Sequence, residues 1–328
     1  MSFCNQVRLI LVSFSFAPVA GFLFAEESIT PGDSVVVARD NVQLGVRDKP
    51  MLAVNSGVQI VVTEVRGNWL GGFTYVDGSK RYGWVHQSEV KRTTSTKRAL
   101  ASGPAKPDNP QDVEAWKKLG VSLHFDEAGN IQSLRADTAV VQDKDLVHLA
   151  GLSSVLSLDL SNQPVSDDGM KPIGNCRSLQ RLYLGSTSVG DAGMASIANL
   201  VGLEVLACPK TQVTGTAFKH VSSLGDLQVL NVDHCAVADE HLIHLNTLSR
   251  LEVLVLAHTQ VTDVGLEHMR PLAQLRVLNL NGTKIKGDGF DNLLGLTELR
   301  MLYVNDCPVE PGVTDKLDDK LPGLAIYD

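Results

Sequence analysis

The feature that most constrains this chain is a 24-residue repeat that begins at residue 131. Eight units follow one another without an insertion, and each begins with an aliphatic residue: Ile131, Val155, Leu179, Leu203, Leu227, Leu251, Leu275 and Leu299. Position four of every unit is leucine, and position eleven is valine or isoleucine. A fixed period of this length indicates a solenoid, in which each unit packs on its neighbours.

The spacing within one unit predicts a short strand, a turn and a short helix. Apolar positions four and six share one face of a strand, because strand side chains alternate with a period of two. Apolar positions sixteen, nineteen and twenty-two have helical spacing. Position thirteen is aspartate in five units, and we expect it to accept hydrogen bonds from the free N–H groups that open its own helix. These residues are Asp143, Asp167, Asp191, Asp239 and Asp263.

The unit LEVLVLAHTQVTDVGLEHM, residues 251–269, resembles the leucine-rich repeat family. It is similar to the 24-residue variety abundant in secreted bacterial proteins, especially of planctomycete type. The resemblance covers about 200 residues. It implies an α/β solenoid with a parallel sheet on the concave face and short helices on the convex face. We expect an N-terminal cap over 111–130, with a helix over 113–119 and a strand over 121–125. A last strand over 324–327 completes a C-terminal cap that ends at residue 328.

Residues 26–92 have another pattern, with short alternating strands separated by Gly, Asp and Asn turns. They resemble bacterial SH3-like domains through Gly57, the turn at 67–69 and the segment 83–85, so we expect a small all-β barrel. The resemblance implies a module of the cell envelope that binds peptidoglycan in some proteins. Its candidate groove consists of Trp69, Tyr75, Tyr82 and Trp84. In the alternative interpretation, the two tryptophans belong to the barrel core. Residues 93–110 are rich in Ser, Thr and Pro and predict a flexible linker.

Residues 1–25 predict a signal peptide. One basic residue, Arg8, precedes an apolar run that ends at Ala25. We therefore expect an exported protein, located in the periplasm, in the envelope or outside the cell. Contact with the membrane is expected only if this segment is kept as an anchor. The formal net charge of −8 argues against a nucleic-acid partner, because such proteins present a basic face.

The repeat places most chemically reactive side chains in structural positions. Four cysteines are expected to be buried free thiols, because no pair fits disulfide geometry: Cys176, Cys208, Cys235 and Cys307. Four histidines share position eighteen, beside the core on the helical side: His148, His220, His244 and His268. His234 and His258 share position eight beside Asp233, and an exposed polar ladder competes there with a metal site. No catalytic motif occurs, so we expect a non-catalytic protein without a cofactor. A metal-dependent enzyme that uses His234 and His258 is kept as a remote alternative.

Positions three and five of each strand should face the concave side. The middle units place an apolar strip there, flanked by tyrosines, and such a strip is a reasonable protein-binding surface. The alternative is that valine merely favours any strand. The candidate residues are Tyr183, Val205, Val229, Asn231, Val253, Val255, Val277, Asn279, Met301 and Tyr303. Position two changes from Glu204 and Glu252 to Arg276 and Arg300, a gradient that could orient a partner. The preferred function is recognition of a protein or peptide, and the first alternative is anchoring to the wall through the SH3-like domain.

Overall fold

The chain divides into two units, residues 1–94 and 95–328. The structure, a computed structural model, describes residues 107–328 apart from 311 and 322. It also describes the backbone of seven N-terminal strands, and these form one sheet in the order β3-β2-β6-β5-β4-β1-β7. The strands are β1 (Ser34–Val37), β2 (Val42–Val46), β3 (Lys49–Val54), β4 (Gln59–Arg66), β5 (Trp69–Val76), β6 (Ser79–His86) and β7 (Val90–Arg92). The expected signal peptide lies outside the described residues, and the SH3-like assignment stays a prediction.

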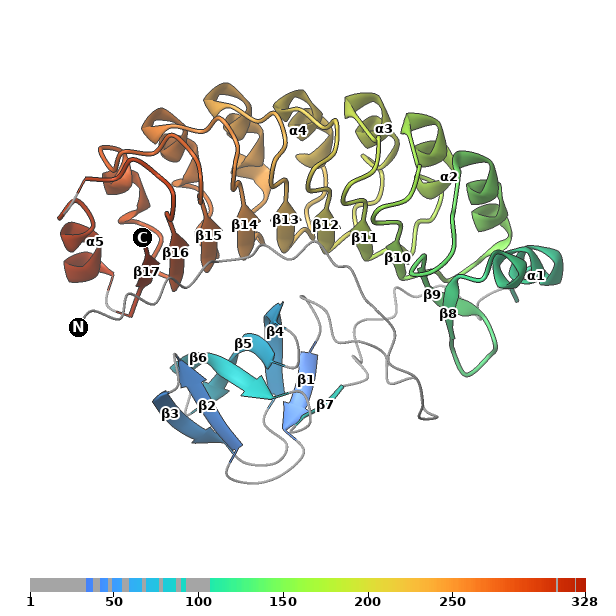
Figure 1. The fold of residues 1–328 in the computed structure, drawn as a ribbon, viewed down its shortest axis with the longest axis horizontal. Coiled ribbons are helices and arrows are strands. Elements are labelled where there is room, and N and C mark those ends of the chain that lie inside the picture. Colours follow the sequence, from blue (N-terminus) through green and yellow to red (C-terminus); the bar gives the residue numbers. More distant parts are fainter. Residues whose placement is uncertain are drawn as a thin grey trace, which may run out of the picture. The chain divides into compact units, whose positions relative to one another are not determined.

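The second unit is a curved solenoid with a sheet on its inner side and short helices on its outer side (Figure 1). Its ten strands are hydrogen-bonded in consecutive order. They are β8 (Ser122–Phe125), β9 (Ile131–Arg135), β10 (Ser157–Asp159), β11 (Arg181–Tyr183), β12 (Val205–Ala207), β13 (Val229–Asn231), β14 (Val253–Val255), β15 (Val277–Asn279), β16 (Met301–Tyr303) and β17 (Ala325–Tyr327). From β9 to β16 each residue pairs with the residue 24 positions later, as in Leu230 with Leu254, so the predicted period is confirmed.

The outer segments are short and mostly 3-10 rather than α-helical. The 3-10 segments are η2 (Asp143–Gly151), η3 (Asp167–Gly169), η4 (Gly215–Ala217), η5 (Asp239–Thr247), η6 (Asp263–Met269) and η7 (Phe290–Leu293). The α-helical ones are α2 (Met170–Ile173), α3 (Asp191–Ser196), α4 (Phe218–Val221) and α5 (Asp315–Lys320). A unit of this length leaves room for only a few helical residues, and short runs tolerate the tighter 3-10 turn. No described helix is long and apolar enough to span a membrane.

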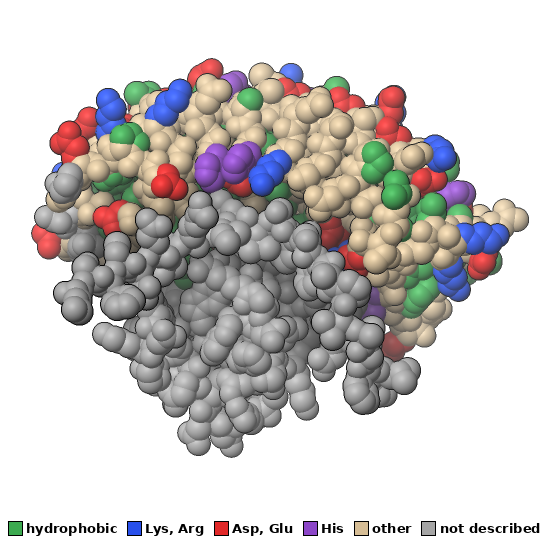
Figure 2. Space-filling model, in the orientation of Figure 1, with side chains coloured by type: hydrophobic (Ala, Val, Ile, Leu, Met, Phe, Trp, Pro, Cys, Tyr) green, Lys and Arg blue, Asp and Glu red, His purple; other side chains and the backbone are tan. Residues whose placement is uncertain are grey.

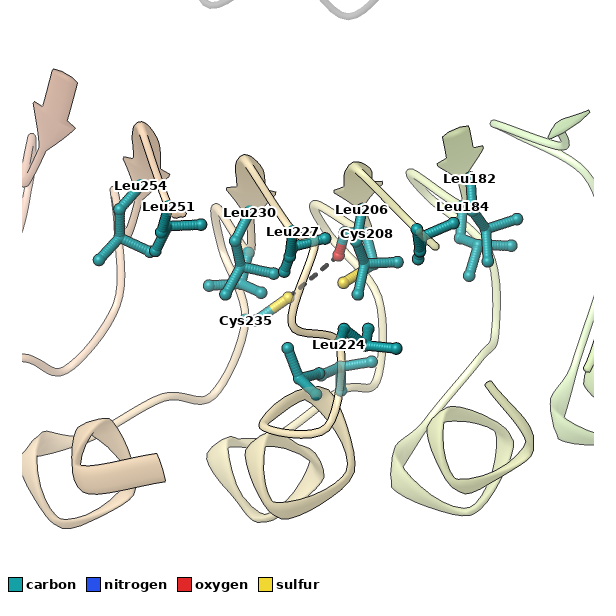
Figure 3. Packing of buried hydrophobic residues seen from close by; sticks show 14 of the residues in the cluster. Leu182, Leu184, Leu206, Cys208, Leu224, Leu227, Leu230, Cys235, Leu251 and Leu254 are labelled. Atoms are coloured by element: carbon teal, nitrogen blue, oxygen red, sulfur yellow. Dashed lines mark hydrogen bonds between the residues drawn. The ribbon is translucent and has the colours of Figure 1, made fainter. Parts of the chain in front are cut away.

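One continuous apolar core runs through the solenoid. The leucines of adjacent strands point into the same interior and stack on one another, as Leu182, Leu206, Leu230 and Leu254 do in Figure 3. All four side chains are fully buried. Each unit buries its strand and its helix against the neighbouring unit, so the packing explains why the leucine spacing recurs without interruption.

Both ends of the solenoid carry additional elements beyond the eight repeats. Helix α1 (Pro110–Leu119) buries Trp116 completely, and β8 pairs antiparallel with β9. The cap begins earlier than expected, because buried Asp108 accepts hydrogen bonds from the backbone N–H groups of Ile131 and Ser153. The last residues of the predicted linker therefore belong to the cap. At the other end β17 adds a parallel strand beside β16.

Candidate functional site

The candidate site is the concave sheet, where equal positions of successive strands lie side by side. Val229 of β13 pairs with Val253 of β14, and Val253 pairs with Val277 of β15. Neighbouring parallel strands are about 4.8 Å apart, so these side chains form a continuous row. The second row runs in the same register through Asn231 and Val255. The two rows together contain all ten predicted contact residues.

The rows are more buried than an exposed strip implies. Val253, Val277 and Tyr303 form a small apolar cluster of their own, and each retains less than a tenth of its accessible surface. The half-buried side chains that pack against this cluster are Val229, Val255, Met301 and Tyr327. The register explains part of this burial, because each branched side chain is flanked by another one on the next strand. Part of the row that we expected to contact a partner thus packs against itself.

The predicted charge gradient along position two is partly cancelled. Arg276 donates from Nη1 to Oε2 of Glu252 at 2.7 Å, across one repeat. Paired charges of opposite sign produce little long-range field, so the gradient is a weaker orienting feature than expected. The aromatic residues Tyr303 and Tyr327 stack at this end of the sheet, with ring centroids 4.6 Å apart.

Beyond the strands, position eight adopts the left-handed backbone conformation in most units. Non-glycine residues hold it with φ between 54° and 62°: Asn162, Ser186, Lys210, His234, His258 and Asp306. Glycine fills the same position at Gly282. Histidine, asparagine and aspartate tolerate this region better than most residues do. The turn therefore presents a short row of polar side chains beyond the C-terminal ends of the strands.

This turn brings Asp233, His234 and His258 together. The Nδ1 atoms of His234 and His258 lie 2.8 and 2.9 Å from the same Oδ1 atom of Asp233. The imidazole rings stack with centroids 4.0 Å apart. Asp233 is buried, whereas the side chain of His234 is 40% exposed and that of His258 is 31% exposed. The predicted approach of these side chains is confirmed.

The cysteines are free thiols, as predicted, although Cys307 is only partly buried. Burial raises the pKa of Cys176 to about 11. Cys235 donates to the carbonyl oxygen of Cys208 at 3.2 Å (Figure 3). A hydrogen bond between the two thiols, together with burial, raises the pKa of Cys208 well above its usual value.

The expectation that the aspartates of position thirteen cap their own helices is wrong, because their hydrogen bonds run to the next repeat. Asp239 accepts from the backbone N–H and the hydroxyl of Thr262, at 2.8 and 2.6 Å, and Thr262 belongs to the next repeat. The four other aspartates bond forward in the same way: Asp143, Asp167, Asp191 and Asp263. Position twelve caps the helix where it carries a hydroxyl group: Ser166 accepts from the N–H of Asp168, and Thr262 accepts from the N–H of Val264. The aspartates therefore link repeats rather than cap helices.

The histidines of position eighteen lie on the helical side, as expected. His148 contacts Asp112 of the N-terminal cap, with Nδ1 and Oδ1 2.7 Å apart. His268 lies 3.7 Å from Glu267. Among the described residues, the only group of three or more side chains with metal-binding proximity is Asp233, His234 and His258.

The aromatic residues of the predicted SH3-like groove lie on two paired strands. Trp69 and Tyr75 belong to β5, and Tyr82 and Trp84 belong to β6. The antiparallel register pairs Gly71 with Trp84. The side chains of the four aromatic residues are outside the described part of the chain, so this groove stays a prediction.

Residues 175–198, the length of one unit, match the family model described as Leucine Rich repeat. No curated protein matches the sequence. A crystal structure of internalin C2 from Listeria monocytogenes is similar, with a TM-score of 0.51, 20% identity, and coverage of 67% of this chain and 92% of that one. The solenoid has the leucine-rich repeat fold.

Two other solved structures are similar to a lesser degree. A leucine-rich repeat protein of Leptospira interrogans gives a TM-score of 0.42 at 16% identity, with 58% of this chain and 57% of that chain covered. A plant ice-binding protein gives a TM-score of 0.47 at 16% identity, with 68% and 79% covered.

Proposed function

We propose that this leucine-rich repeat solenoid is a non-catalytic recognition protein whose concave sheet binds a protein or peptide outside the cytoplasm. The observation that carries the proposal is the pair of in-register rows at positions three and five. They place valine and asparagine next to one another over β13 to β15. A row of apolar side chains beside amide groups offers both contact area and hydrogen bonds to a partner's main chain.

The half-buried members of the rows are the side chains that a partner would contact. Val229 and Val255 retain more surface than Val253 or Val277. Asn231 and Asn279 each accept a hydrogen bond from a backbone N–H two residues later, which fixes the orientation of their amides. A fixed amide presents its NH₂ group at lower entropic cost than a mobile one does.

The test compares two double variants of the full chain. In Val229→Glu/Val255→Glu, two charges lie on the concave rows. In Ile243→Glu/Val264→Glu, the same charges replace apolar residues of the convex side that are 44% and 65% exposed. We expect the concave variant to lose its partner in affinity capture from envelope extract, and the convex variant to retain it. Equal capture by both, at unchanged thermal stability, would contradict the proposal.

A further inference from the structure

The polar group beyond β13 and β14 has a composition that the recognition function does not require. Two imidazoles and one carboxylate converge from consecutive repeats, and their ligand atoms lie within 4.8 Å of one another. Figure 2 shows histidine side chains (purple) gathered at the surface near the middle of the solenoid. From this geometry we infer that Asp233, His234 and His258 form a binding site for a late first-row divalent metal ion, such as zinc.

The distances fit a metal ion between the three groups. Zinc binds imidazole nitrogen and carboxylate oxygen at about 2.0–2.2 Å, so two ligands at 90–110° are separated by about 2.9–3.4 Å. The two separations between Nδ1 and Oδ1 are 2.8 and 2.9 Å in the metal-free arrangement. Because the two rings are stacked with an interplanar angle of 28°, both must also rotate until each ring plane contains the metal ion. Each imidazole would then carry its proton on Nε2 instead of Nδ1.

The charge of Asp233 favours a cation. Its side chain is 6% exposed, and its Oδ1 atom contacts both imidazoles. A buried carboxylate is costly unless a positive charge compensates it. A divalent ion satisfies the carboxylate and uses both rings as ligands, and imidazole ligands select metals of this class.

The backbone holds the two rings in place before any ion arrives. Both histidines have left-handed φ values, 57° and 54°, which direct them from equivalent points of adjacent turns. On the far side of His258, a Cβ at Gly282 would lie 2.7 Å from the ring atom Cδ2, so this glycine leaves room for the ring. On the near side, Lys210 occupies the same position one repeat earlier and is exposed. Its long side chain is free to turn away from a bound cation.

The repeat itself provides substitutions that preserve the fold. Asparagine occupies position eight at Asn162 and position seven at Asn281, so His234→Asn, His258→Asn and Asp233→Asn each introduce a residue that another unit already carries. The matched control is His244→Asn, which removes an exposed histidine from η5 on the convex side.

The experiment titrates the untagged full chain with zinc chloride by calorimetry, and metal content is measured after dialysis. We expect one zinc per chain, at least tenfold weaker binding in each of the three site variants, and unchanged binding in the control. Zinc should also raise the midpoint of thermal unfolding in the wild type and the control alone, because a ligand of the folded state stabilises it. Absence of stoichiometric zinc, equal affinity in the site variants, or equal loss in the control would overturn the inference.

Discussion

At the scale of single residues, the aspartates of position thirteen hold the solenoid together. Each carboxylate accepts hydrogen bonds from the start of the next helix, as Asp239 does from Thr262. The negative charge lies at a helix N-terminus, where the free N–H groups favour it. These contacts recur in five repeats, so the hydrogen bonds between repeats follow the same period as the apolar core.

Replacing one of these aspartates should measure how much its hydrogen bonds to the next repeat contribute to stability. Asp239→Ala leaves the N–H and the hydroxyl of Thr262 without their acceptor, so the free energy of unfolding should fall by about 1–3 kcal/mol. Urea denaturation, monitored by circular dichroism, measures this free energy of unfolding. Glu240→Ala, next in sequence and exposed, is the control and should change stability little. Equal effects of the two substitutions would show that the forward hydrogen bonds contribute nothing.

The cysteines give a second prediction at this scale. A chain that begins after residue 25 should contain four titratable thiols when it is denatured without reductant. In the folded protein, Cys176 should resist alkylation at pH 8, since burial holds its pKa near 11. Its reaction with iodoacetamide should accelerate as the pH rises towards that value, because the thiolate is the nucleophile. A thiol count near zero, or rapid alkylation of native Cys176 at pH 8, would contradict this account.

At the scale of the element, four of the outer helical segments approach their neighbours more closely than an ordinary side chain allows. Gly265 is one of four glycines at position fifteen, together with Gly169, Gly193 and Gly289. A Cβ on Gly265 would lie 2.4 Å from Oδ1 of Asp239 and 2.8 Å from Leu242. Glycine at this position therefore makes room for the carboxylate of the preceding repeat.

Gly265→Ala should consequently destabilise the protein. We expect a loss of about 1–3 kcal/mol, because the added methyl group must displace a packed carboxylate and a core leucine. Gly225→Ala is the matched control, since a Cβ there would meet nothing within 4 Å. It should be neutral or slightly stabilising, through the reduced freedom of the unfolded chain. Thermal unfolding of the two variants distinguishes them, and a Gly265→Ala protein as stable as the wild type would refute the close approach.

The sequence predicts the strands, the period and the core well, because burial imposes apolar residues at fixed spacing. It predicts the position-thirteen contacts less well. A single unit read alone makes Asp263 look like the cap of its own helix, whereas the partner lies in the next repeat. The recurrence of glycine two residues later was the available signal. The burial of Val253 and Val277 was also missed, since alternation identifies a face of a sheet but gives no measure of how neighbouring rows cover one another.

At the scale of the whole molecule, the solenoid combines a continuous core with the sheet face that we propose for recognition. The core extends from Trp116 in the N-terminal cap to Leu321 near the C-terminus. A solenoid of this kind keeps its concave rows at fixed spacing, because each strand is held by the neighbours on both sides. Such preorganisation lowers the entropic cost of binding an extended or folded partner.

Site-specific photo-crosslinking tests the central claim most directly. A photoreactive phenylalanine derivative replaces Val229 on the concave row in one full-length protein, and Val264 on the convex side in another. Both are irradiated in envelope extract, and the adducts are identified by mass spectrometry. The concave-face account predicts a discrete protein or peptide adduct at position 229, competed away by unlabelled wild type, and none at position 264. The same adducts at both positions, or adducts at 264 alone, would contradict it.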